Sequence, residues 1–295
     1  MRKIRIIAVI AILILVVCVN SLQAVEETKP VTPSKVTAPQ IIGFQLEDIN
    51  FSSSLLGRDY QLIVILPSEY DSSQQHYPVL YLLDGNLLFG MAANLSLLMN
   101  MIDNVPEMII VCIAQKAKNP DEFGLLRELD YKIPEVQDAP KESRADLFLA
   151  AFKKEIIPFV ETNYRSDPGK RIIWGYSSGG FFVLYALCHE PDLFRTYIAG
   201  SGDTELSSLY VPAHDQKLVS RKGNPIDLYL SVGTLETKEM QSTPAALNSL
   251  VKAINAKKYP GIRLVTETYE GESHGAGGIA LTFIRGLRKT FPTVK

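Results

Sequence analysis

The chain has 295 residues, of which 46% are hydrophobic and 21% charged, so it can bury the core of one large domain or two small ones. Its formal net charge is −2, and no run of lysine and arginine follows the first residues, which argues against the polybasic surface of a nucleic-acid-binding protein. Neither an H-x-x-x-H nor a C-x-x-C spacing occurs, and we expect no metal site and no cofactor.

The first 24 residues, MRKIRIIAVIAILILVVCVNSLQA, have a basic start, an unbroken apolar run from Ile6 to Val19 and a polar end at Ala24. This pattern predicts a secretory signal peptide, so we expect export to the periplasm or secretion. The apolar run of 14 residues is short for a membrane span, and retention as an uncleaved anchor is the alternative. Cleavage as a lipoprotein before Cys18 is disfavoured, because Val17 is bulkier than the small residue usual there.

The mature chain is expected to start with a tether and continue as one catalytic domain. Loss of residues 1–24 leaves 27 basic against 32 acidic residues, a net charge of −5. Residues 25–40, VEETKPVTPSKVTAPQ, are rich in proline, threonine and lysine and predict a flexible linker, and residues 41–295 form the predicted domain. Cys112 and Cys188 lie in apolar segments, so we expect two buried thiols and no disulfide.

Strand-like and helix-like segments alternate through this domain. Runs at residues 44–51 and 59–66 predict two strands joined by a turn at Gly57, and the wholly apolar run 78–83 predicts a central strand. Expected helices at 87–102, 144–164, 181–190, 244–258 and from 279 onward separate expected strands at 107–114, 171–176, 194–200, 226–232 and 262–269. This order predicts an α/β fold with a mainly parallel sheet, an antiparallel start and helices on both faces.

Two long stretches, residues 115–143 and 202–225, show no clear periodicity and contain the proline, aspartate and lysine of surface loops. Both follow the carboxyl end of a predicted strand. In open α/β sheets that edge carries the binding crevice, so we expect both loops to form walls of the site. The alternative is that they are variable insertions without a role.

The segment RIIWGYSSGG, residues 171–180, places two serines between glycines where a buried strand meets an apolar helix. The core, Gly175 to Gly179, fits the G-x-S-x-G nucleophile elbow, in which a strained turn presents the central serine. That serine is Ser177. The glycines on either side let the backbone approach closely, and Gly180 is expected to let the following helix pack tightly on its strand.

A serine hydroxyl needs a histidine to take its proton, and the chain has four. His76 precedes a strand and so lies at the opposite edge of the sheet, and His189 ends the elbow helix, more than ~15 Å from the serine at about 1.5 Å per residue. His274, in YEGESHGAGG, directly follows the last strand at its carboxyl end. We therefore favour His274 as the base over His214, which lies in a long loop.

The base needs a carboxylate that fixes its tautomer. Glu236 follows the strand of residues 226–232 in SVGTLE, at the correct edge of the sheet, and gives the order serine, acid, histidine that is typical of α/β-hydrolases. Asp203 in GSGDTE, one strand earlier, is the alternative acid, and Glu239 is a more distant one.

The oxyanion formed on attack needs two backbone N–H groups. The residue after the nucleophile, Ser178, is expected to supply one. The turn after the strand at 78–83, in LLDGNLLFG, is expected to supply the other from Asn86, with Asp84 as a turn former in the alternative interpretation.

Taken together, these motifs resemble those of the esterase D-like α/β-hydrolases. That family includes S-formylglutathione hydrolases, feruloyl esterases, mycolyltransferases and siderophore trilactone esterases. The resemblance runs from about residue 41 to 291 and rests on GRDYQLIVILPSEY, YPVLYLLDGN, LRELDY, GYSSGGFFVLYAL, SVGTLE and YEGESHG. It implies Ser177 as nucleophile, His274 as base and an acid at Glu236. YPVLYLLDGN and GESHG are most similar to exported esterases near the siderophore branch, although that branch often has a Ser-Pro-Ser segment with a tryptophan where this chain has AGSGDTELSSLY.

We therefore expect an exported serine carboxylic-ester hydrolase that works through an acyl-enzyme on a small-molecule ester, without a nucleic-acid partner and without a membrane span after signal cleavage. A siderophore trilactone esterase and a feruloyl- or acetyl-type acyl-sugar esterase are the narrower alternatives, and a non-catalytic binding protein on a hydrolase fold is the remote one. The candidate substrate-binding residues are Arg127, Tyr131, Phe181 and Phe182, which could equally be loop and core residues. The sequence does not indicate an oligomeric state.

Overall fold

The structure is a computed structural model that describes residues 43–136 and 139–291. The predicted signal peptide at residues 1–24 and the predicted linker at residues 25–40 lie outside the described residues and stay predictions.

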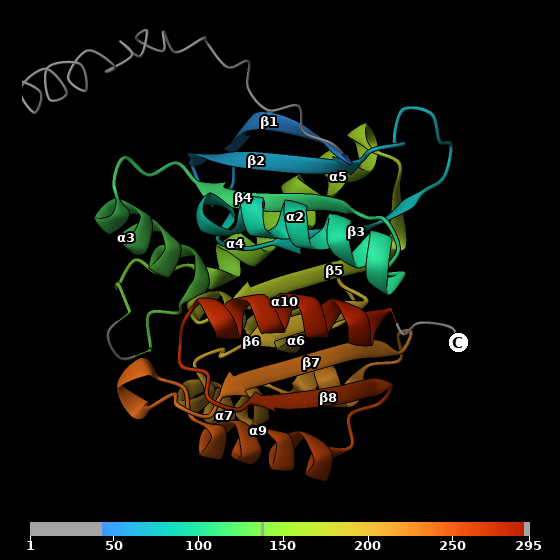
Figure 1. Cartoon of the computed structure of the whole chain (residues 1–295). Helices are drawn as coiled ribbons and strands as arrows, with labels where there is room; N and C mark the ends of the chain where they lie inside the picture. Colours follow the sequence, from blue (N-terminus) through green and yellow to red (C-terminus); the bar gives the residue numbers. More distant parts are fainter. Residues whose placement is uncertain (1–42, 137–138, 292–295) are drawn as a thin grey trace, which may run out of the picture. The chain divides into compact units, whose positions relative to one another are not determined.

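One mixed sheet forms the centre of the fold (Figure 1). Over the described residues its strand order is β1-β2-β4-β3-β5-β6-β7-β8. The strands are β1 (Phe44–Ser53), β2 (Arg58–Pro67), β3 (Tyr77–Leu82), β4 (Ile109–Gln115), β5 (Ser166–Tyr176), β6 (Thr196–Gly200), β7 (Ile226–Gly233) and β8 (Ile262–Tyr269).

Of the strands that the structure describes, only β2 runs against the others, so the strand direction reverses twice along the sheet. β1 pairs with β2, and β2 with β4, in antiparallel register, whereas every neighbouring pair from β4 to β8 is parallel. The antiparallel start and the mainly parallel sheet are thus confirmed. Because the carboxyl ends of β3, β5, β6, β7 and β8 share one edge, the loops that follow these strands meet there.

Helices cover both faces of the sheet, as expected (Figure 1). α2 and α10 pack on one face over a core that contains Trp174 and Phe283, and α4, α5, α6, α7 and α9 enclose the larger core on the other. The helices are α2 (Gly85–Asp103), α3 (Pro120–Tyr131), α4 (Ala145–Ala151), α5 (Ile157–Asn163), α6 (Ser178–His189), α7 (Thr204–Ala213), α8 (Gln216–Ser220), α9 (Pro244–Lys257) and α10 (Ala276–Thr290), with a π-helical turn at Phe152–Ile156 and a 3-10 turn at Lys238–Met240.

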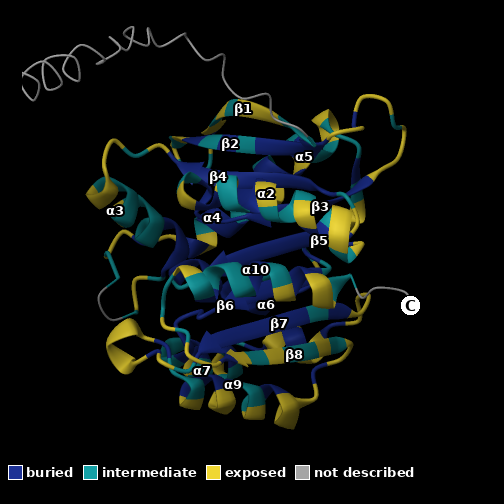
Figure 2. Ribbon diagram, in the orientation of Figure 1, coloured by how far each residue is buried: buried dark blue, intermediate teal, exposed yellow. Residues whose placement is uncertain are grey.

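α2 is long and apolar enough to cross a membrane by length and composition alone. In this fold it is a covering helix, because Leu88, Ala92, Ala93 and Met99 pack it against the sheet. Figure 2 shows that the buried residues concentrate in the strands, while exposed residues lie on the outer sides of the helices.

The prediction that two long stretches are irregular loops was wrong in detail, and so was the prediction of one continuous helix at 144–164. The stretches 115–143 and 202–225 are not irregular throughout, since they contain α3, α7 and α8. α3 carries a start signal in its sequence: the Asn119 side chain accepts the backbone N–H of Glu122, and Pro120 opens the first turn.

The predicted helix at 144–164 forms as α4 and α5 with the π turn between them. The π turn lies just before Pro158, whose ring nitrogen cannot donate a helical hydrogen bond.

The two cysteines of the domain are free and buried, as expected. Cys112 lies in β4 within the core under α2, and Cys188 lies in α6 within the core on the other face. The sheet therefore separates the two thiols, and no disulfide can join them.

Candidate active site

Ser177 occupies the turn between β5 and α6 in a strained conformation. Its φ is 58° and its ψ −128°, a region that residues with a Cβ rarely adopt. The turn is compact because Gly175 lies against Gly179: a Cβ on Gly175 would stand 2.2 Å from the carbonyl oxygen of Gly179. The geometry is that of the predicted elbow, which directs the central side chain out of the sheet.

Gly180 makes a close contact, although not with its own strand. A Cβ there would lie 2.7 Å from the carbonyl oxygen of Gly200 and 2.7 Å from the Cα of Gly202, both at the end of the neighbouring strand β6. Gly202 has no room for a Cβ either, because one would meet the backbone of Gly180 at 2.7 Å. The first turn of α6 therefore sits directly on the loop after β6 and fixes its position relative to Ser177.

His274 and Glu236 meet at the carboxyl edge of β7 and β8. His274 Nδ1 lies 2.8 Å from Glu236 Oε2, and the Glu236 side chain is fully buried. The other oxygen, Oε1, accepts the Ser201 hydroxyl at 2.5 Å and the Gly233 N–H at 2.8 Å. An ionised carboxylate only accepts hydrogen bonds, so His274 Nδ1 carries the proton in this contact and Nε2 is free to accept one.

Ser177 and His274 line the same open pocket, whose volume is about 400 Å³. The structure thus brings together the serine, the histidine and the acid that the sequence indicated. The described residues show no hydrogen bond between Ser177 Oγ and His274, a contact that is often loose in unliganded enzymes. The Tyr176 ring lies against the imidazole, with centroids 5.1 Å apart, and limits its movement.

Asp203, the alternative acid, has a different partner. Its carboxylate forms an ion pair with Lys132 at the end of α3, and both residues are almost fully buried. Burial raises the pKa of Asp203 above its ordinary value, although the nearby ammonium opposes that shift. Asp203 therefore lines the pocket as half of an ion pair, and Glu236 is the acid in contact with the histidine.

The two predicted oxyanion donors lie at the starts of two helices. Ser178 opens α6, so its backbone N–H has no partner within the helix, and its hydroxyl donates to Glu128 at 2.6 Å. Asn86 lies in the first turn of α2, and its side chain makes two hydrogen bonds to the backbone of Gln115, at 2.7 and 2.9 Å. The Asn86 side chain is thus held in place, while its N–H as the second donor stays a prediction.

A family profile with the description "Putative esterase" matches residues 52–281. The chain belongs to this esterase family. Ferri-bacillibactin esterase BesA from Bacillus subtilis (strain 168) is 28% identical over 76% of this chain and 82% of that relative. Among solved structures, the BES protein from Bacillus cereus has a TM-score of 0.74 at 25% identity and covers 87% of this chain and 98% of that one. An IroE-like serine hydrolase from Shewanella oneidensis has a TM-score of 0.72 at 21% identity, over 85% and 82% of the two chains.

The resemblance to esterases and the α/β-hydrolase fold are thereby confirmed, and the protein is a carboxylic-ester hydrolase. A non-catalytic binding protein on this fold is not supported. The esterase acts on small-molecule esters, while its compartment and the identity of its substrate are matters for a proposal.

The four predicted substrate-binding residues of the esterase lie in different places. Arg127 lines the pocket and donates to Asp84 at 2.7 and 3.0 Å and to the Tyr176 carbonyl at 3.0 Å. Tyr131 is fully buried below this pair, where its hydroxyl oxygen accepts the Asp84 N–H. Phe181 and Phe182 belong to the core under α6, in agreement with their alternative interpretation as core residues.

The other histidines of the esterase are engaged elsewhere. His189 Nε2 lies 2.9 Å from the Tyr210 hydroxyl, and His214 Nδ1 lies 3.0 Å from the Tyr210 carbonyl oxygen. Neither residue lines the pocket that contains Ser177. His76 precedes β3, at the edge of the sheet opposite to the pocket.

Three contributors to the site carried no clear sequence signal. Ser201 supports the buried Glu236 from the loop after β6, Glu128 holds the Ser178 hydroxyl, and Lys132 neutralises Asp203. Each acts through a partner at least 35 positions away in the sequence, so local pattern could not reveal it.

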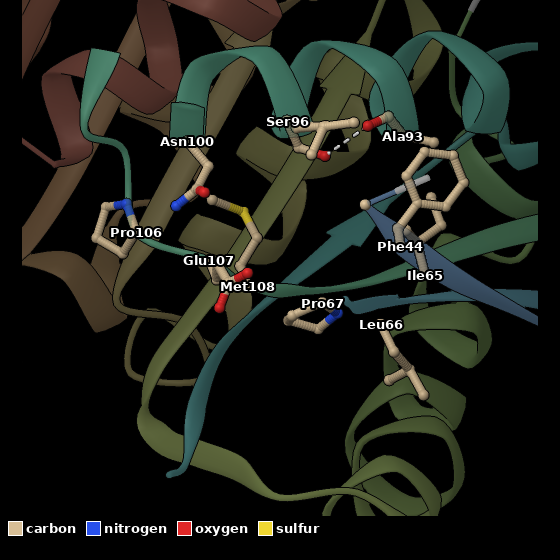
Figure 3. A pocket seen from close by; sticks show the side chains of 12 residues that line it. Phe44, Ile65, Leu66, Pro67, Ala93, Ser96, Asn100, Pro106, Glu107 and Met108 are labelled. Atoms are coloured by element: carbon tan, nitrogen blue, oxygen red, sulfur yellow. Dashed lines mark hydrogen bonds between the residues drawn. The ribbon is translucent and has the colours of Figure 1, made fainter. Parts of the chain in front are cut away.

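A small hollow lies at the opposite edge of the sheet, between α2, the strands β1 and β2 and the segment that precedes β4 (Figure 3). Phe44, Ile65 and Met108 line it, and its volume is about 30 Å³. That is room for a water or two and not for an ester substrate.

Proposed function

We propose that the protein is an exported serine esterase that hydrolyses siderophore-type trilactones through a triad of Ser177, His274 and Glu236. The observation that carries the catalytic part is the contact of 2.8 Å between His274 Nδ1 and the buried Glu236, in the pocket that also contains the strained Ser177. The substrate class is supported by the similarity to ferri-bacillibactin esterase BesA along most of both chains.

The acylation step follows from this geometry. Ser177 Oγ attacks the ester carbonyl carbon while His274 Nε2 takes the hydroxyl proton, and Glu236 stabilises the imidazolium that forms. The negative charge on the carbonyl oxygen is stabilised by the N–H groups of Ser178 and Asn86. Collapse of the tetrahedral intermediate breaks the ester bond, and His274 gives its proton to the leaving alcohol.

Deacylation uses the same groups in the second half of the cycle. Water gives a proton to His274 Nε2 and attacks the acyl-enzyme, and collapse of the second intermediate returns that proton to Ser177. The buried Glu236 keeps the imidazole in the required tautomer in both halves, because Ser201 and Gly233 fix the carboxylate.

Export is proposed from residues 1–24 alone. Expression of the full chain with separation of compartments tests it: the expected product lies outside the cytoplasm and begins at Val25. A chain that keeps Met1 and sediments with membranes would contradict cleavage and support the anchor.

The enzymatic test combines labelling with a substrate panel. A fluorophosphonate is expected to add one label to the peptide that contains Ser177, and kcat/KM is expected to be highest for a tricatecholate trilactone compared with methyl ferulate and p-nitrophenyl butyrate. Preference for methyl ferulate would favour the acyl-sugar alternative, because the lining of the pocket and not the triad sets discrimination. Absence of both labelling and turnover would contradict the triad.

A further inference from the structure

A second pocket lies beside the candidate active site and has a volume of about 630 Å³. The segment between α3 and α4 forms one wall with Ile133 and Val136. α6 contributes Tyr185 and His189, α7 contributes Leu206 and Tyr210, and His214 directly follows α7. The volume is in the range of small-molecule sites, and the lining combines apolar side chains with a few hydrogen-bonding groups, as in such sites.

Four aromatic side chains form one cluster in this pocket: Tyr185 and His189 on α6, Tyr210 on α7, and His214 directly after α7. The ring centroids of Tyr210 and His214 are 3.9 Å apart at an interplanar angle of 16°, and those of Tyr185 and His189 are 4.2 Å apart. The hydrogen bond of 2.9 Å between His189 and the Tyr210 hydroxyl joins the two pairs. A fixed set of ring faces and edges of this kind matches a planar aromatic ligand.

The imidazoles of the cluster are only half-buried, so they remain open to a ligand. Burial, together with the nearby His214 and Lys217, lowers the pKa of His189 below its ordinary value, which favours the neutral ring. Charged side chains stay at the rim, where Glu135, Arg144 and Asp146 are exposed. The interior thus offers stacking and hydrogen bonding without a dominant charge.

Two wall segments are shared with the catalytic pocket. Lys132 lines the catalytic pocket and its neighbour Ile133 lines the second one. Asp203 lines the catalytic pocket, and Leu206, three residues later, lines the second. The buried Lys132–Asp203 ion pair therefore joins the two segments that both pockets use.

The distance between the two pockets can be estimated along α6, because the helix lines both of them. Ser178, at the start of α6, lines the catalytic pocket, and Tyr185 on the same helix lines the second. Seven residues of helix correspond to about 10 Å, and the eleven residues from Ser178 to His189 correspond to about 16 Å. A simple acetyl or butyryl ester is too short to bridge that distance, whereas an ester with several arms is long enough.

We propose that this second pocket binds a distal aromatic arm of the ester substrate while another arm lies at Ser177. The proposal rests on the proposed function, which supplies a multi-armed substrate, and it adds the site that recognises the part not being cleaved. Binding at a distance from the reacting bond favours large polyaryl esters over small ones through KM, because the contact is the same in the ground state and the transition state.

The kinetic test compares two leucines of α7. Leu206→Arg introduces a long side chain into the pocket, whereas Leu209, 73% exposed on the same helix and not part of the lining, gives the matched control Leu209→Arg. Leu206→Arg is expected to raise KM for a tricatecholate trilactone about tenfold, with kcat and p-nitrophenyl butyrate turnover within about twofold of wild type. Equal trilactone KM values for both variants would overturn the proposal.

A second variant covers the case in which Leu206→Arg fails to fold. His214→Ala removes one ring of the cluster without filling the pocket and is expected to raise the same KM severalfold, again with unchanged p-nitrophenyl butyrate turnover. An unchanged trilactone KM for His214→Ala, in a variant with the wild-type melting temperature, would likewise overturn the proposal.

Direct binding separates this proposal from the proposed function. On enzyme inactivated by a fluorophosphonate, NMR titration with 2,3-dihydroxybenzoate is expected to give saturable binding that Leu206→Arg abolishes and that cyclohexanecarboxylate does not reproduce. If wild-type enzyme hydrolyses p-nitrophenyl butyrate but no trilactone, the proposed substrate class fails, and this titration still decides whether the pocket binds aromatic rings. Absence of saturable binding would overturn the aromatic site.

Discussion

Two buried carboxylates lie just after neighbouring parallel strands, Asp203 after β6 and Glu236 after β7. One is paired with a lysine ammonium and the other with a histidine imidazole. Glu236 accepts a hydrogen bond from His274 at 2.8 Å, and Asp203 is paired with Lys132. Both face the same edge of the sheet, and both are at most 5% exposed. Burial and position are therefore alike, and the partner makes the difference.

The partners differ in what they do with a proton. A neutral imidazole that donates to a carboxylate has a free electron pair on its other nitrogen and can accept a proton there. An ammonium nitrogen has no free electron pair and can only donate. In the proposed mechanism the pair of His274 and Glu236 exchanges protons with Ser177, whereas the pair of Lys132 and Asp203 joins two walls of the pocket. A buried acid near a nucleophile is thus not by itself a catalytic acid.

The largest expected effect concerns the proposed nucleophile, Ser177. Ser177→Ala should lower ester turnover by about four to six powers of ten, because the covalent path is lost. Ser178→Ala should keep most activity, since its expected contribution comes from the backbone. Initial rates with p-nitrophenyl butyrate measure both, and the reverse result would mean that the register of the elbow is wrong.

Loss of the base should be nearly as severe. His274→Ala removes the proton acceptor, so we expect a fall of about four to six powers of ten in kcat, as for a triad histidine. His214→Ala is the matched control, and its turnover of p-nitrophenyl butyrate should stay within about threefold of wild type. Equal activities of the two variants would remove the base role from His274.

The acids provide the direct comparison. Glu236→Gln keeps the size of the side chain but loses its negative charge, and we expect kcat to fall by about two to four powers of ten. Asp203→Asn should cost less than tenfold in kcat, roughly, because Asp203 does not contact the histidine. Full activity of Glu236→Gln together with an inactive Asp203→Asn would transfer the acid role to Asp203.

The lysine of the second cluster should affect stability more than chemistry. Lys132→Met leaves Asp203 buried without its ion pair, and we expect a loss of about 3 kcal/mol in the free energy of unfolding. Urea denaturation measures the loss, and the double variant Lys132→Met with Asp203→Leu should recover much of it. A single variant as stable as wild type would show that the pair does not hold the walls.

A smaller effect than at the proposed triad residues themselves is expected at Ser201, which donates a hydrogen bond to the proposed acid Glu236. Ser201→Ala removes one hydrogen bond to Glu236 and should lower kcat about tenfold without changing KM. A change in KM alone would point to the pocket and not to the acid.

The sequence predicted the parts of this molecule that depend on local pattern. Apolar runs located the strands, and the G-x-S-x-G turn with its glycines located Ser177, because such turns need residues without a Cβ. Glu236 and His274 were selected because each follows a strand at the edge where the elbow lies, and the structure places these two residues in contact.

Other features depend on tertiary contacts that no local pattern contains. Lys132 lies in a polar stretch, and its burial is set by Asp203, 71 positions later. Tyr131 has the ring and hydroxyl typical of a substrate-binding residue, yet its side chain is fully buried beside the pair of Arg127 and Asp84. The insertion of β4 between β2 and β3 follows from pairing across the sheet and not from chain order.

The two cysteines give the folded state a chemical reporter. Burial raises the pKa of the Cys188 thiol to about 12 and that of Cys112 further still, so neither forms a reactive thiolate near neutral pH. The sheet keeps them on separate faces, and each becomes accessible only when the core on its own side opens. Because the two thiols lie in separate cores, pulse labelling with a thiol reagent measures the opening of each core separately. Under oxidising conditions the folded domain cannot form a disulfide between them.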